Sequence, residues 1–178
     1  MKPLHLLVSI LKRMGRLIRY RLDLRRPTPW RALREARSAE ELIRHAWPAS
    51  ARNLALAAAF LPLPLQREAA IAYLCCRALD AFEDLSASSA QAIQGVRQAA
   101  RFLCGSSAAA PARPERRGSS DSDPLEAFLA AELRPLREAL EALLPAQQRR
   151  VKRLLLRLAA AMVMQIKKSA AATEPADE

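Results

Sequence analysis

The chain has 178 residues, of which 51% are apolar and 4% aromatic, with only four glycines. This length and composition allow a buried core and favour helices over a sheet-rich fold. The net charge of +11 predicts an anionic partner, namely phosphate groups, an acidic lipid surface or nucleic acid, and does not choose among them.

Residues 1–30 are expected to form a basic amphipathic helix, over 3–24, and a linker. Such a helix can lie on an anionic membrane surface or pack on the domain with a solvated basic side, and both readings stay open. Its apolar run is interrupted by Lys12, Arg13 and Arg16, and no small-residue cleavage site follows. We therefore expect neither a signal peptide nor a membrane span, but a cytoplasmic chain that is at most peripheral on the inner membrane face.

Residues 31–104 are expected to contain the core helices. Ser38 and Glu41 form a capping box, and Pro62 and Pro64 form a corner between two helices. The apolar patterns predict helices over 37–46, 49–60, 66–85 and 89–103.

The rest of the chain divides into a loop and two more helices. Residues 105–124 are low in complexity and predict a flexible loop. Residues 125–178 are expected to complete the same domain with helices joined at Pro145 and a frayed tail after Ser169. Those helices are expected over 125–143 and 146–168.

The cysteines and histidines show no spacing typical of a disulfide framework or a zinc site. Cys75 and Cys76 are adjacent, Cys104 is alone, and only two histidines are present. We expect buried, reduced thiols in a cytosolic compartment.

One polar stripe runs along the expected helix over 66–85. Tyr73, Arg77, Asp80 and Asp84 are spaced by four, three and four residues, which places them within about 60° of one another on a helix. Glu83 flanks this stripe, and most of the remaining surface of the helix is apolar. Such a helix belongs in the middle of a domain, so the stripe must face partner side chains or a wet cavity.

Two interpretations of the stripe remain open. Arg77 can neutralise Asp80 or Asp84, in which case nothing binds. Alternatively, three carboxylates opposite one arginine repel one another unless a cation is present, and carboxylate oxygens can share magnesium ions.

The residues around this stripe resemble the squalene/phytoene synthase family of head-to-head isoprenyl diphosphate synthases. The resemblance is carried by Ser50-Ala-Arg52-Asn53-Leu54, Leu61-Pro62, Arg67 and Tyr73-x-x-x-Arg77-x-x-Asp80-x-x-Glu83-Asp84. The segment CRALDAFED is closer to squalene synthase than to phytoene synthase. Leu54 departs from the pattern, because family members often have an aromatic residue there.

The resemblance implies an all-α, isoprenoid-synthase-type helical bundle around a central cavity. Two aspartate-rich motifs hold Mg²⁺ and clamp two prenyl (farnesyl) diphosphates, which condense through a cyclopropyl intermediate. Squalene-type members then use NADPH. The resemblance implies that the catalytic residues are Tyr73 and Arg77. It implies that Arg52, Asn53 and Arg77 bind the diphosphate. It implies that Asp80, Glu83 and Asp84 bind magnesium.

The second aspartate-rich motif is not found, so the expected bundle is incomplete at its C-terminal side. The later acidic residues, none of which forms such a motif, are Glu115, Asp121, Asp123, Glu126, Glu132, Glu138, Glu141, Glu174, Asp177 and Glu178. A truncated product, one half of a two-chain or self-associating enzyme, and a shortened descendant with a binding role all fit. We expect a chain that is weak or inactive by itself.

Two functions of other classes compete with this one. A catalytically silent membrane-surface protein would use the 3–24 helix and the last basic helix. A basic nucleic-acid-binding helical protein would use the arginines of 12–26 and 149–157. These arginines are spread over several helices with little aromatic interleaving, so no nucleic-acid partner is expected.

Overall fold

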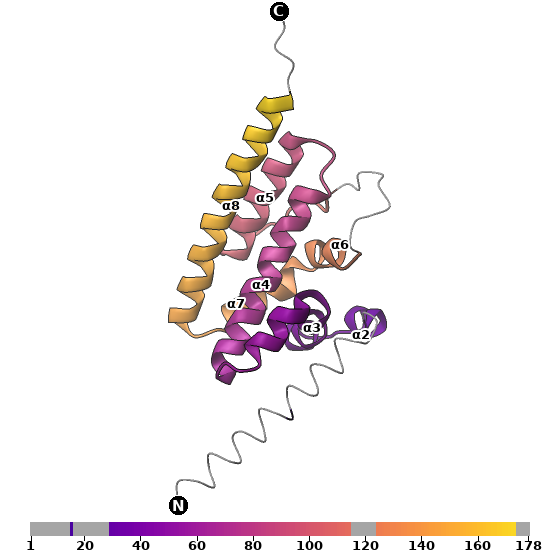
Figure 1. Ribbon diagram of the computed structural model, residues 1–178, viewed down its shortest axis with the longest axis vertical. Coiled ribbons are helices and arrows are strands. Elements are labelled where there is room, and N and C mark those ends of the chain that lie inside the picture. Colours follow the sequence, from indigo (N-terminus) through magenta and orange to yellow (C-terminus); the bar gives the residue numbers. More distant parts are fainter. Residues whose placement is uncertain (1–14, 16–28, 115–123, 174–178) are drawn as a thin grey trace, which may run out of the picture. The chain divides into compact units, whose positions relative to one another are not determined.

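The computed structural model describes residues 15, 29–114 and 124–173, and it contains helices but no strand among them (Figure 1). The elements in chain order are α2 (Trp30–Arg34), α3 (Ala39–Ala58), α4 (Leu63–Asp84), α5 (Ser89–Leu103), α6 (Pro124–Ala131), α7 (Leu133–Glu141) and α8 (Pro145–Thr173). The all-α class predicted from the sequence is confirmed and is the class of the isoprenoid-synthase fold. The expected helix over 3–24 lies outside the described residues, apart from residue 15.

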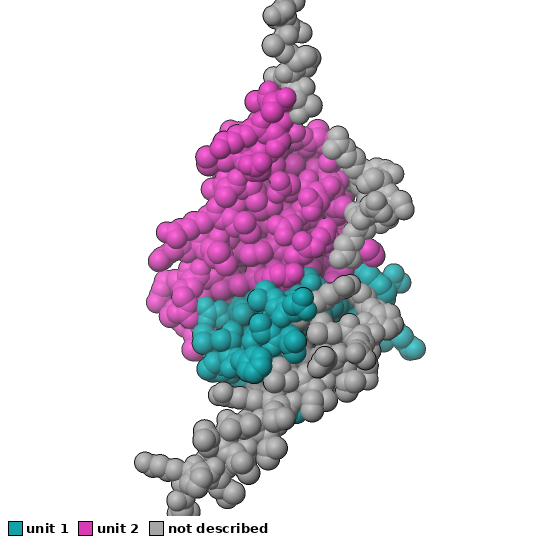
Figure 2. Space-filling view, in the orientation of Figure 1, with its two compact units in different colours: residues 1–70 teal, residues 71–178 magenta. Residues whose placement is uncertain are grey.

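The chain divides into two compact units, residues 1–70 and 71–178, with the boundary inside α4 (Figure 2). The sequence places boundaries near residues 30, 104 and 124, and these stay predictions. No helix in the described part is both long and apolar enough to cross a membrane.

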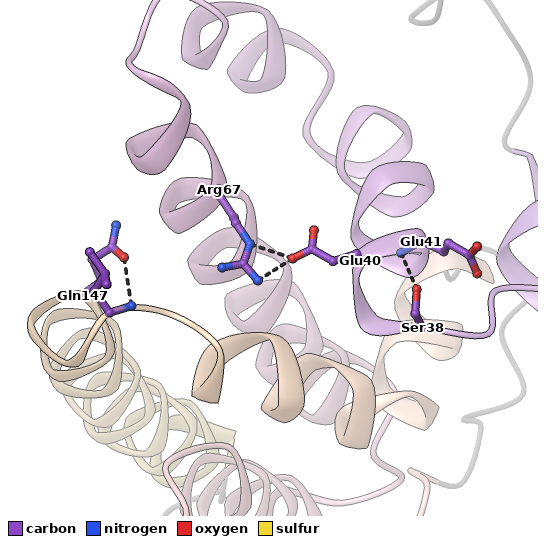
Figure 3. Close-up of polar contacts among 6 residues, drawn as sticks. Ser38, Glu40, Glu41, Arg67 and Gln147 are labelled. Carbon is purple, nitrogen blue, oxygen red and sulfur yellow. Dashed lines mark hydrogen bonds and ion pairs between the residues drawn. The ribbon is translucent and has the colours of Figure 1, made fainter.

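In the first unit, α2 contacts α3, and the start of α3 is fixed by its cap. Ser38 accepts a hydrogen bond from the Glu41 backbone N–H at 3.2 Å (Figure 3). The Glu41 carboxylate accepts one from the Arg37 N–H at 2.8 Å. These bonds satisfy donors that have no partner inside the helix. The N-cap at Ser38 is therefore confirmed, while the carboxylate of Glu41 reaches the N–H of Arg37, one residue before the cap, and not that of Ser38. The short helix α2 was not predicted.

Residues 39–58 form one helix, so the prediction of two helices separated near Pro48 is wrong. A proline inside a helix removes one backbone hydrogen bond and strains the preceding turn. Buried residues on both sides of Pro48 offset this cost: Ala46, Trp47, Ala51 and Ala55 are at most 6% exposed. Their continuous apolar stripe favours a single helix through the proline.

The corner between α3 and α4 is closed by Gln66. Its side-chain amide donates hydrogen bonds to the carbonyls of Ala59 at 3.2 Å and Leu61 at 2.6 Å. Pro64 lies in the first turn of α4, where a backbone N–H would have no partner anyway, so the helix begins earlier than predicted.

An ion pair joins the first turn of α3 to the start of α4. Arg67 Nε donates to Glu40 Oε1 at 2.7 Å, and its guanidinium also pairs with the same oxygen through Nη2 (Figure 3). Both side chains are partly exposed, so this pair orients the helices more than it stabilises them.

In the second unit, α5 packs along α8, and α7 contacts both of these helices (Figure 1). Helix α5 begins as predicted, because Ser88 accepts a hydrogen bond from the Gln91 N–H at 3.3 Å. The predicted helix over 125–143 is two helices, α6 and α7, with non-helical backbone at Glu132. Pro135 has no N–H and fits the first turn of a new helix better than a helix interior.

The C-terminal end of α8 also differs from prediction. The helix continues to Thr173, so the fraying expected after Ser169 is not observed within the described residues. Its start is held by glutamines: Gln147 Oε1 accepts from the Leu144 N–H at 3.1 Å (Figure 3), and Gln148 donates to the Glu141 carbonyl at 2.7 Å.

Helices α4 and α5 approach closely where Gly95 faces Phe82. A Cβ atom placed on Gly95 would lie 2.8 Å from Phe82 Cδ1 and 3.4 Å from Phe82 Cβ. Phe82 is 1% exposed and cannot move aside without disturbing the core. The absence of a side chain at Gly95 therefore fixes how the acidic end of α4 packs.

Candidate functional site

The second half of α4 carries the polar stripe. Tyr73, Arg77, Asp80 and Glu83 are half-buried and Asp84 is exposed, while Ile71, Leu74, Ala78, Leu79 and Phe82 between them are buried. The helix thus has an apolar side in the core and a narrow polar side, as the sequence predicts.

Arg77 is the centre of this stripe because its guanidinium pairs with two acids. Nη1 lies 3.4 Å from Asp80 Oδ2, one turn later on α4. Nη2 pairs with Glu126 Oε1 on α6. The side chains of Arg77 and Glu126 are only 27% and 11% exposed. An acid buried to this degree is costly without a partner, so the arginine compensates for Glu126 as well as for Asp80.

The pairing predicted between Arg77 and Asp80 is therefore observed, but Glu126 was missed. No motif marks this residue, which lies on α6 and is separated from α4 in the sequence by α5 and the segment after it. The available signal was chemical: Glu126 is the one acid in the apolar segment PLEAFLAA, and a lone acid in such a segment needs a basic partner.

Three carboxylates gather at the C-terminal end of α4. Burial raises the pKa of Asp80, Arg77 opposes this shift, and the charge of Asp84 adds to it. Burial also raises the pKa of Glu83, with further contributions from Asp84 and Asp80. The last turn of α4 contains no basic residue, and acids at the C-terminal end of a helix face the negative end of its dipole. Burial is thus the main cause of both raised pKa values, repulsion among the acids adds to it, and Arg77 offsets the shift at Asp80.

The sequence profile of the squalene/phytoene synthase family matches residues 47–176. The chain belongs to the squalene/phytoene synthase family. Comparisons with curated proteins and with solved structures gave no match. The match covers the polar stripe, Glu126 and α8, and it supports a prenyltransferase of the squalene/phytoene synthase type. The family in general depends on magnesium and acts on prenyl diphosphates.

The donor chemistry of the cluster fits magnesium in part. Within residues 29–114 and 124–173, no group of three or more His, Cys, Asp or Glu side chains is placed to hold a metal ion together, and this includes the three acids of α4. Proteins usually hold Mg²⁺ through one or two carboxylates, while water and substrate phosphates supply the remaining oxygens. The carboxylates of α4 supply only oxygen ligands, which suits an ion that arrives with a diphosphate.

The two remaining site residues predicted from the family resemblance come from another helix. Arg52 and Asn53 lie on α3, in the first unit, and Asn53 is exposed. The other five, from Tyr73 to Asp84, share α4.

The three cysteines are free thiols, as predicted, but the predicted burial holds only for Cys75, because Cys76 and Cys104 are half-buried. Cys75 is fully buried, and burial raises its pKa. Burial and the charge of Asp80 raise the pKa of Cys76 to about 11. A thiol with a raised pKa is a poor nucleophile at neutral pH, so Cys76 is unsuited to covalent catalysis despite its position beside the stripe.

Proposed function

We propose that this chain binds prenyl diphosphate through a magnesium site at the C-terminal end of α4. The reaction is the head-to-head condensation of two farnesyl diphosphates in isoprenoid or squalene biosynthesis. The observation that carries this proposal is the crowding of Asp80, Glu83 and Asp84 at a helix end that has no basic residue to relieve it. Membership of the squalene/phytoene synthase family supports the substrate class.

Asp80, Glu83 and Asp84 are the residues that would hold the ion. When bound, magnesium neutralises the charge that grows on a departing diphosphate. The chain's own residues prepare the site: Arg77 fixes the carboxylate of Asp80 through their ion pair, and Glu126 in turn holds the guanidinium.

The remaining roles concern the diphosphate and the hydrocarbon. Arg77 would contact diphosphate oxygens, and Tyr73, one turn before Arg77, would face the reacting centre. The family resemblance assigns diphosphate contacts to Arg52 and Asn53 of the first unit as well. Apolar residues beside the stripe would exclude water from an allylic cation. NADPH would be required only for a squalene-type product.

Activity of the isolated chain should be weak or absent. The sequence has one aspartate-rich motif, and a two-diphosphate reaction in this family uses two. A second chain, or a second copy of this one, would have to supply the other half of the clamp.

Binding can be tested apart from turnover. Calorimetric titration with a farnesyl thiodiphosphate analogue should give binding that needs Mg²⁺ and weakens at least about tenfold in Asp84→Asn, the loss of one charge-assisted contact. Glu138→Gln removes an exposed acid of α7 and should bind as wild type. Binding that is equal with and without Mg²⁺ would refute the proposal.

A further inference from the structure

Helix α8 is strongly basic in its first half, over residues 149–157, and carries two more cations near its C-terminal end, at 167 and 168. Its 29 residues include no aspartate or glutamate. The basic residues are Arg149, Arg150, Lys152, Arg153, Arg157, Lys167 and Lys168. An acid-free helix of this kind concentrates much of the net charge of +11 on one element.

One side of α8 belongs to the core of the second unit. Val151, Leu155 and Ala159 are at most 6% exposed, and Met162 and Ile166 continue the same stripe at 7%. Helix α5 packs against α8 over a long contact (Figure 1). Packing of this side fixes the position of α8 in the second unit. The opposite side does not belong to the core of this unit.

The opposite side combines cations with exposed apolar side chains. At about 100° per residue, seven exposed residues fall within about 100° of one another. We call this set the outer face of α8: Arg150, Arg153, Leu154, Arg157, Ala161, Met164 and Lys168. Leu154 is 48% exposed and Met164 61%, so this face offers two large apolar side chains among its cations.

We propose that the outer face of α8 docks on an anionic phospholipid bilayer. Arginine and lysine match lipid phosphates in charge, and Leu154 and Met164 can enter the boundary between headgroups and acyl chains. The phosphates of a nucleic acid would pair with the cations, but they would gain no binding free energy from Leu154 and Met164. The outer face also has no aromatic residue on which bases could stack.

The length of α8 suits this orientation. A helix of 29 residues extends about 43 Å. Docking through the outer face would lay α8 along the membrane surface, because this face runs parallel to the helix axis. Docking of this kind would bring the unit that carries the polar stripe to the phase into which prenyl products partition, and it does not depend on catalysis by this chain.

The test uses the full chain and vesicles. Sedimentation with phosphatidylcholine vesicles containing one-third phosphatidylglycerol should show binding that pure phosphatidylcholine and high salt abolish. Each neutralised arginine should weaken partitioning by about fivefold. Arg153→Gln with Arg157→Gln should therefore lower it by about 25-fold. Arg97→Gln with Arg101→Gln, which removes two exposed arginines at the same spacing from α5, should lower it far less.

The apolar part has its own test. Leu154→Ser with Met164→Ser should weaken vesicle binding without lowering thermal stability, because both residues are exposed. Equal losses in the α5 and α8 arginine pairs would overturn the proposal. So would unchanged binding in the α8 pair, or salt-sensitive affinity for a DNA duplex in a chain that ignores anionic vesicles.

Discussion

Arg77 on α4 is paired with Glu126 on α6, and both side chains are mostly buried. The pair joins α4, which carries the aspartate-rich motif, to α6, a helix for which the sequence predicts no function. The same guanidinium also pairs with Asp80 on its own helix, so the partner of this acid is itself held by a contact from outside α4.

Loss of Glu126 should therefore destabilise the second unit. Glu126→Gln leaves the half-buried Arg77 without its main partner and should lower the free energy of unfolding by about 2 kcal/mol, less than for a fully buried pair. Urea denaturation measures this change. Glu138→Gln is the matched exposed control and should remain within about 0.5 kcal/mol of wild type.

A double-mutant cycle isolates the pair itself. Arg77→Gln, Glu126→Gln and the double variant should give a coupling energy of at least about 1 kcal/mol, because each single change leaves a buried charge unpaired. Additive effects of the two changes would contradict the ion pair.

Loss of the Asp84 charge should have the opposite effect on the free energy of unfolding. Asp84→Asn removes one of three mutually repelling acids from the negative end of a helix, so it should raise the free energy of unfolding by about 0.3–1 kcal/mol. Asp84→Glu keeps the charge and should show no gain. Thermal unfolding without divalent cations measures both variants, and a destabilised Asp84→Asn would show that the acids do not repel one another.

The close approach at Gly95 gives a prediction about packing. Alanine is the better helix former, but its Cβ would overlap Phe82, so Gly95→Ala should destabilise by about 1–3 kcal/mol. Gln94→Ala, at an exposed neighbouring position, should be neutral or slightly stabilising. Phe82→Leu combined with Gly95→Ala should cost less than the sum of the two single changes, as chemical denaturation can show.

The thiols give a pH dependence. A raised pKa means that the folded state favours the neutral thiol, so this contribution to stability is present below the unfolded pKa of about 8.5 and is lost as pH rises through the folded value. For Cys76 that value is about 11. Reaction with a disulfide reagent should be slow near neutral pH and should accelerate between about pH 9 and 11. Rapid reaction of Cys76 in the folded chain at pH 7 would contradict this account.

The polar stripe could be predicted from the sequence because it depends on one helix period. The regular spacing of four residues, Tyr73, Arg77, Asp80 and Asp84, is enough to place them on one side of a helix. The caps at Ser38 and Ser88 likewise depend only on neighbouring residues. Local rules failed where burial outweighed them: the packed residues on both sides of Pro48 carry α3 through the proline. They also failed at Glu126, whose partner is distant in sequence and becomes visible only when α6 is placed beside α4.

The central claim is that the acids at the end of α4 hold a divalent cation together with a diphosphate. Electron paramagnetic resonance of Mn²⁺, used in place of Mg²⁺, measures the bound fraction directly in the presence of inorganic diphosphate. The account predicts binding to the wild-type chain and to Glu138→Gln, and loss of at least about tenfold in affinity in Asp80→Asn and Asp84→Asn. Equal Mn²⁺ binding by all four chains, or none by the wild type with diphosphate present, would contradict it.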